Sequence, residues 1–102
     1  MPDLNKLILR LADHEVDMVI VGGYAAMAHG VTLLTQDVDI CCSFHEDNLK
    51  RIGQALADLH PVHRMTPQRL PLEITSTFCS GLRNMYLDTD WGQLDCLSEV
   101  LG

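Results

Sequence analysis

Apolar and polar positions follow two different periods along this chain, and together they predict both helices and strands. In residues 4–14 the apolar side chains recur at the spacing of one helix face, and Asp3 before them is a residue type that caps helix N-termini. This face consists of Leu4, Leu7, Ile8 and Leu11. Residues 17–21 then form a continuous apolar run of strand length, which predicts a central strand covered on both faces.

The middle of the chain predicts two further helices and a second strand. The pair Gly22-Gly23 ends the apolar run, and the alanine-rich residues 24–29 predict a short helix that ends at Gly30. Residues 37–42 alternate in character as a strand does, and residues 43–46, Ser-Phe-His-Glu, match a capping box. The helix that follows has one apolar stripe, formed by Leu49, Ile52, Leu56 and Leu59.

The second half of the chain predicts a long loop and then β-structure. Residues 60–71 contain three prolines and predict a long mobile loop. Residues 73–78, 82–87 and 93–97 are short strand candidates, separated by turns at 80–81 and 90–92. The fold class is therefore α+β with a mixed sheet, and 102 residues fit a single domain.

Composition narrows the possible partners. With 47% hydrophobic and 21% charged residues, the chain has the composition of an ordered globule, and no apolar run is long enough to span a bilayer. A net charge of −7 argues against an open grip on an extended nucleic acid, because that binding depends on lysine and arginine at the phosphates. The N-terminus lacks the layout of a secretory signal, so we expect a cytoplasmic protein. The four cysteines are expected to be reduced thiols in the core.

Asp37 and Asp39 are the residues that predict a chemistry. Residues two apart in a strand share a face, so both carboxylates are expected on one side of the strand. Two like charges about 4 Å apart cost on the order of 4 kcal/mol at an effective dielectric near 20, and a divalent cation relieves that cost. Asp88 and Asp90 have the same spacing but run into Trp91-Gly92, which predicts a hairpin turn. The first pair is therefore the better metal ligand, although strand-end aspartates that face water remain the alternative.

Asp95 is the third acidic candidate. It lies in the apolar run of residues 94–97, where an unpaired aspartate would be costly. Its alternative reading is a buried carboxylate bonded to Arg83 or to backbone amides. A Gly-Gly pair after a strand lets the backbone approach a phosphate, so these glycines with three carboxylates predict a two-metal phosphoryl-transfer site. His60 and His63 have no partners at zinc spacing.

These motifs resemble those of the nucleotidyltransferases of the DNA polymerase β superfamily, and most closely the small bacterial members, many of them linked to toxin–antitoxin pairs. The resemblance rests on residues 19–26, 29–31, 35, 37–40 and 92–95. It implies a nucleotidyltransferase fold, which is a mixed sheet with helices packed mainly on one face. It also implies two Mg²⁺ ions held by Asp37, Asp39 and Asp95. The nucleoside triphosphate, such as ATP, would contact Gly22, Gly23, Tyr24 and Thr35.

The implied reaction is attack of an acceptor hydroxyl on the α-phosphate, with transfer of NMP, release of pyrophosphate and Asp95 as the base. Two departures keep alternatives open. Relatives often carry an arginine four residues before the first aspartate, where this chain has Leu33; Arg64, Arg69 and Arg83 are candidates to replace it. Relatives also continue into a further basic helical segment, whereas this sequence stops at Gly102, as a fragment would. A degenerate partner-binding module and a phosphohydrolase that uses water are the other two hypotheses.

Overall fold

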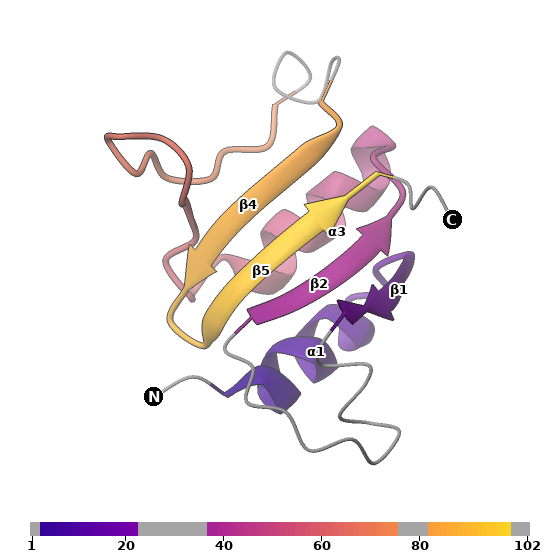
Figure 1. Cartoon of the computed structure of the whole chain (residues 1–102). Helices are drawn as coiled ribbons and strands as arrows, with labels where there is room; N and C mark the ends of the chain where they lie inside the picture. Colours follow the sequence, from indigo (N-terminus) through magenta and orange to yellow (C-terminus); the bar gives the residue numbers. More distant parts are fainter. Residues whose placement is uncertain (1–2, 23–36, 76–81, 99–102) are drawn as a thin grey trace.

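The computed structural model describes residues 3–22, 37–75 and 82–98, which form a mixed five-stranded sheet with two helices on one of its faces (Figure 1). The helices are α1 (Leu4–Asp13) and α3 (Glu46–Leu56). The strands are β1 (Met18–Val21), β2 (Asp37–Cys42), β3 (Val62–His63), β4 (Asn84–Thr89) and β5 (Gly92–Leu97). The α+β class and the mixed sheet are therefore confirmed.

The strand order is β1-β2-β5-β4-β3. Strands β2 and β5 are parallel, while the other neighbouring pairs are antiparallel. The β4–β5 hairpin turns at residues 90–91, as the sequence predicts. This hairpin reverses the chain and brings β5 beside β2, although paired residues such as Asp37 and Gln93 are 56 positions apart in the sequence.

One face of the sheet and the two helices enclose the core. Alternate residues of β2, β5 and β4 point into it, together with one side of each helix. The fully enclosed side chains include Leu7 and Leu11 of α1, Leu49, Ile52 and Leu56 of α3, and Val38, Ile40, Leu87, Leu94 and Cys96 of the strands. The opposite sheet face is thereby left to the intervening residues of the same strands.

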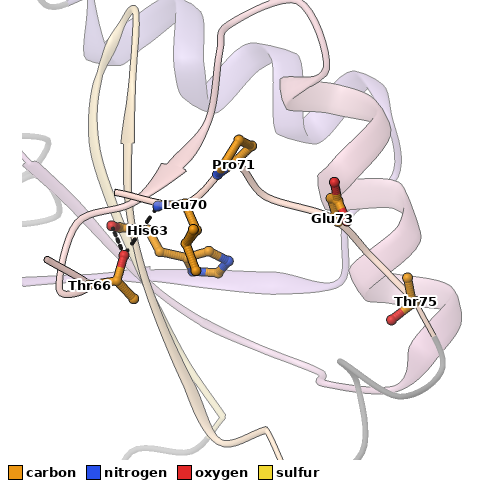
Figure 2. A pocket seen from close by; sticks show the side chains of 6 residues that line it. All are labelled: His63, Thr66, Leu70, Pro71, Glu73 and Thr75. Carbon is orange, nitrogen blue, oxygen red and sulfur yellow. Dashed lines mark hydrogen bonds between the residues drawn. The ribbon is translucent and has the colours of Figure 1, made fainter. Parts of the chain in front are cut away.

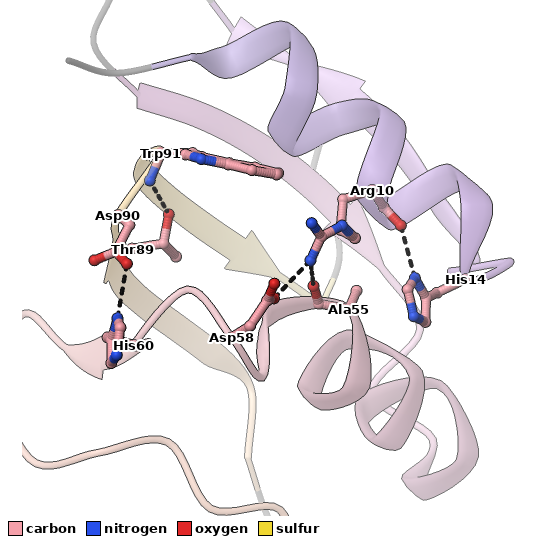
Figure 3. Close-up of polar contacts among 8 residues, drawn as sticks. All are labelled: Arg10, His14, Ala55, Asp58, His60, Thr89, Asp90 and Trp91. Atoms are coloured by element: carbon pink, nitrogen blue, oxygen red, sulfur yellow. Dashed lines mark hydrogen bonds and ion pairs between the residues drawn. The ribbon is translucent and has the colours of Figure 1, made fainter.

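Helix α1 begins and ends as expected. The Asp3 carboxylate accepts a hydrogen bond from the Lys6 amide at 3.1 Å, and His14 caps the C-terminus. Figure 3 shows how the helix is tied to the rest of the molecule: the Arg10 guanidinium lies 4.7 Å from the centre of the Trp91 ring. The same group donates to the Ala55 carbonyl at 3.1 Å and to Asp58 at 2.6 Å. Arg10 therefore joins α1 to the β4–β5 turn and to the end of α3.

The prediction of a central, doubly covered strand at residues 17–21 is wrong. Strand β1 covers residues 18–21 and pairs within the described sheet with β2 alone, and Val19 is 65% exposed. An apolar run shows that a strand has hydrophobic side chains, but it does not show whether a second layer covers both faces. Strand β1 is therefore an edge strand of the described sheet.

The predicted capping box at residues 43–46 is also wrong. Helix α3 begins at Glu46, and its N-cap is His45, whose Nδ1 accepts a hydrogen bond from the Asp47 amide at 3.3 Å. The Ser43 hydroxyl instead accepts a hydrogen bond from the His45 amide at 3.2 Å. Ser43 therefore organises the turn that precedes the cap.

The segment predicted to be a long loop, residues 60–71, contains β3, and an isolated bridge joins Val62 to Pro71. Strand β4 begins two residues later than expected, and residues 73–75 form no strand. The rest of the strand predicted at 73–78, the helix predicted at 24–29 and its end at Gly30 lie outside the described residues. No helix in the described part of the chain is long and apolar enough to cross a membrane.

Cys42 and Cys96 are buried reduced thiols, as expected, whereas Cys41 is only half-buried. It occupies the next position along β2 after Ile40, so its side chain lies on the sheet face away from the helices. Cys79 lies outside the described residues.

Asn48 is a buried polar residue that ties α3 to the strand ends. It is 2% exposed, and its side-chain oxygen accepts a hydrogen bond from the Asp17 amide at 2.7 Å. Its amide nitrogen donates to the Asp17 carbonyl at 3.1 Å and to the Ser43 carbonyl at 2.7 Å. One side chain therefore satisfies backbone groups just before β1 and just after β2, which fixes where α3 leaves the sheet.

We expect Asn48→Ala to lower the free energy of unfolding by about 2–3 kcal/mol, because it leaves buried backbone groups without partners. Asn48→Asp, which has the same shape, should cost at least as much, since a carboxylate cannot donate to the two carbonyls. Urea unfolding followed by circular dichroism measures both, with exposed Gln54→Ala on the same helix as the control. An Asn48→Asp variant as stable as the native chain would contradict this network.

Candidate metal centre

One row of residues crosses the sheet face away from α1 and α3 and defines the candidate site. Val21 of β1 is paired with Asp39 of β2, Asp39 with Asp95 of β5, and Asp95 with Tyr86 of β4. The Arg64 amide, one residue beyond β3, donates to the Tyr86 carbonyl at 2.9 Å. Directly paired residues project from the same face of a sheet, so these five side chains share one side.

Three carboxylates meet in this row and beside it. Asp37, Asp39 and Asp95 each offer an oxygen atom, and these oxygens lie within 4.8 Å of one another. Val38, between the two aspartates of β2, is completely buried in the core on the opposite face. The alternation of β2 and its parallel register with β5 therefore gather the three carboxylates predicted from the sequence.

The second aspartate pair has a different environment, although its spacing is the same. Asp88 forms an ion pair with Arg69, and Asp90 accepts a hydrogen bond from the His60 ring at 2.7 Å. Among the described residues, only the first pair belongs to a group that could hold a metal ion. Each carboxylate of the second pair thus has a basic partner of its own.

The surroundings of Asp39 disfavour its charged form. Burial, followed by the charges of Asp37 and Asp95, raises the pKa of the Asp39 carboxyl above its ordinary value of 3.8. The Arg64 guanidinium acts in the opposite direction but is the weakest of the causes. A cation placed among the three oxygens would relieve this repulsion.

Gly22 is required next to Asp39. Its φ of +75° lies in the left-handed region, and a Cβ atom there would approach Asp39 Oδ2 to 2.6 Å. That distance is far inside van der Waals contact, so a side chain at this position would displace the carboxylate. Gly22 thus lies against the Asp39 carboxylate, and its contact with a triphosphate stays a prediction. Gly23, Tyr24 and Thr35, predicted to contact a nucleotide, lie outside the described residues, as does Leu33.

Arg64 is the basic residue that the structure brings to the triad. Its Nη1 lies 2.8 Å from Asp95 Oδ1, and its side chain is 21% exposed. The guanidinium carbon is 5.8 Å from the centre of the Tyr86 ring. The sequence offers Arg83 as an alternative partner for Asp95. In the structure the ion-pair partner is instead Arg64, in the segment after β3. Arg64 was a candidate only because it is basic; nothing in its local sequence distinguishes it from Arg69.

The residues fit a hard divalent cation. Carboxylate oxygens are the ligands that Mg²⁺ prefers, and three of them converge here from two adjacent strands. Arg64 is an ion-pair partner of one of them, Asp95. Asp37, Asp39 and Asp95 would hold it.

A separate cavity lies beside β3. His63 is paired with Leu87, whose side chain is in the core, so His63 projects toward the helix face rather than toward the carboxylates. Figure 2 shows its ring beside Leu70 in a cavity of about 370 Å³, which Thr66, Pro71, Glu73 and Thr75 also line. Burial lowers the pKa of His63, and the cavity contains no member of the triad.

Comparisons with known proteins found no similar protein. No family model, curated protein or solved structure matches this chain. The case for a function therefore rests on the geometry of the sheet face.

We predict that Gly22→Ala destabilises the protein by about 1–3 kcal/mol and moves Asp39, because both the positive φ and the 2.6 Å approach oppose a Cβ atom. Thermal unfolding of a double-mutant cycle separates the two causes. In an Asp39→Ala background the oxygen is gone, so Gly22→Ala should cost less than it does in the native chain. Equal costs in the two backgrounds would rule out the contact between these residues.

Asp39→Asn should raise the melting temperature of the metal-free protein at pH 7 by a few degrees. Since the folded pKa lies above 3.8, the folded state disfavours the charged form, and this penalty is absent below pH 3.8 and complete above the raised pKa. The gain should therefore shrink as the pH falls toward 3.8. Melting curves in a chelator measure it, with Asp88→Asn, which breaks an ion pair with Arg69, as the control without a gain. A lower melting temperature for Asp39→Asn at pH 7 would contradict the repulsion.

Proposed function

We propose that this protein is a metal-dependent nucleotidyltransferase that transfers NMP from a nucleoside triphosphate to an acceptor hydroxyl. The observation that carries the proposal is the register of β2 and β5, which sets Asp39 directly beside Asp95, with Asp37 on the same face. Such a reaction uses carboxylates that hold metal ions. Here two carboxylates lie on one strand and a third on the neighbouring strand, and a glycine lies against Asp39. The nucleotidyltransferase fold is part of the same proposal.

Phosphoryl transfer depends on positioning and on neutralisation of charge rather than on covalent help from the protein. Two bound Mg²⁺ ions would supply positive charge at the phosphates and lower the pKa of a bound hydroxyl. The carboxylates of Asp37, Asp39 and Asp95 would hold those ions. Gly22 would allow the Asp39 carboxylate to stay in place beside those ions, because it has no side chain to displace that carboxylate.

Asp95 is the residue we assign as the base for the acceptor hydroxyl. It lies beside Asp39 and is 15% exposed, so the reacting groups would be partly shielded from water. Its Oδ1 is paired with Arg64 in the metal-free protein. The acceptor would be a protein, an RNA or a small molecule, and a cognate toxin or antitoxin is the partner we propose to test first.

The test is transfer of label from each of the four α-³²P nucleoside triphosphates in the presence of Mg²⁺. We expect label on a candidate partner protein, on RNA or on a small hydroxyl compound. The transfer should fall at least about a hundredfold in Asp37→Ala, which removes charge stabilisation at the phosphates. Asp88→Ala is the matched control: it removes a carboxylate two strands away that Arg69 already neutralises, and it should retain transfer.

Three results would count against the proposal. Absence of transfer across a broad acceptor screen would contradict it, and so would transfer that persists in a chelator. Release of free NMP or phosphate without an acceptor would instead identify a phosphohydrolase that uses the same carboxylates.

A catalytically degenerate binding module is the second candidate, and one observation favours it. Arg64 already gives Asp95 a cation, as an ion-pair cluster that only stabilises a fold would need. Isothermal titration of Mg²⁺ with each nucleotide separates the two functions. Metal-dependent nucleotide binding that is lost in Asp39→Ala supports the enzyme, whereas no binding of any nucleotide together with a stable partner in a pull-down supports the module.

A further inference from the structure

Arg64 reaches the triad from two strands away. Its backbone lies beside Tyr86 at the far side of β4, and β4 separates it from β5. Adjacent strands are about 4.8 Å apart, so the Arg64 side chain must extend across the width of β4 to touch Asp95. The Tyr86 ring, 5.8 Å from the guanidinium carbon, lies along that path. An extended arginine over an aromatic ring retains much of its attraction to the ring when its far end changes partner.

The contact uses an atom that a metal ion also requires. Arg64 Nη1 and Asp95 Oδ1 are both inaccessible to water, and the ion pair at 2.8 Å is the contact that joins them. A divalent cation bound through Asp95 Oδ1 would have to displace the guanidinium. A half-buried guanidinium that loses its carboxylate favours a new anion, because its Nη1 is inaccessible to water and would be left without a charge partner.

Asp88 is an alternative carboxylate on the same side of the sheet. Its Oδ2 forms an ion pair with Arg69, while its Oδ1 is inaccessible to water and has no hydrogen-bond partner among the described residues. The anion that would accompany the metal ion, a polyphosphate, has the oxygen atoms to accept a displaced guanidinium, and arginine suits that geometry.

We propose that Arg64 is a tethered cation that occupies Asp95 in the metal-free protein and transfers to the polyphosphate of the incoming nucleotide, so that metal and nucleotide bind together. This inference rests on the proposed function and concerns how its site is regulated. Arg64 disfavours the metal ion alone and favours the metal ion with its polyphosphate. A residue that merely stabilised the fold would shift both affinities in the same direction.

The experiment compares two affinities in the full chain and in Arg64→Gln. The first is for Mn²⁺ alone, measured by electron paramagnetic resonance of the free ion. The second is for inorganic tripolyphosphate, the part common to every nucleoside triphosphate, measured by calorimetry at saturating Mn²⁺. We expect Arg64→Gln to bind Mn²⁺ about fivefold more tightly and Mn²⁺-tripolyphosphate about fivefold more weakly, which is a coupling of ordinary size.

Arg51→Gln is the control, because it removes an exposed arginine of α3, on the other face of the sheet, and leaves the Arg69–Asp88 ion pair intact. Both affinities should stay within about twofold of those of the native chain. Arg64→Lys keeps the charge on a shorter side chain, so its Mn²⁺ affinity should lie between those of the native chain and Arg64→Gln. If Arg64→Gln melts at a lower temperature than the native chain in a chelator, Arg64→Lys is the variant whose affinities test the proposal.

The outcomes separate this inference from the proposed function. If Mn²⁺ binds the native chain and both Arg64 variants equally well, or binds the variants more weakly, the inference is overturned while the metal site stands. If neither the native chain nor any Arg64 variant binds Mn²⁺, with or without tripolyphosphate, both fail. Binding of Mn²⁺ to Arg64→Gln but not to the native chain would support the inference directly.

Discussion

The parallel pairing of β2 with β5 is the constraint on which the site depends. It sets Asp39 beside Asp95 on one face and Ile40 beside Cys96 in the core on the other. A slip of one residue would turn the carboxylates into the core and the apolar side chains to water, at a prohibitive cost. The hydrophobic core therefore does more than hold the fold together: by fixing this register, it also fixes which charges meet. The enclosed side chains of α1 and α3 support the same sheet face.

The cost of that arrangement falls on the opposite face. Three carboxylates within 4.8 Å repel one another. The pKa of Asp39 is raised, first by burial and then by its acidic neighbours. Arg64 relieves part of the repulsion at Asp95. Clustered like charges are expected where a protein binds a charged ligand, because the stability given up in the free state is recovered when the ligand binds. Asp88 and Asp90 have the same spacing but belong to no such cluster among the described residues.

Local signals in the sequence predicted much of the fold. The apolar period and Asp3 predicted α1, and the alternation around Asp37 and Asp39 predicted β2, because the side chains that decide these elements are close neighbours along the chain. The place of β1 at the edge of the described sheet could not be predicted, because strand order depends on pairings between segments far apart in the sequence. The N-cap of α3 shifted from Ser43 to His45 because the Ser43 hydroxyl accepts from the His45 amide instead.

For the candidate site, the sequence by itself determined which carboxylates share a face of β2 and that Asp95 lies in an apolar strand where it needs a partner. Spacing along a strand sets the face of each side chain, so Asp37 and Asp39 could be chosen without a structure. Only the tertiary structure decided that Asp95 joins them and that Arg64, rather than Arg83, is its cation. Those contacts span many residues and depend on strand order and register, which arise from how the whole sheet packs and leave no mark in the residues next to Asp95 or Arg64.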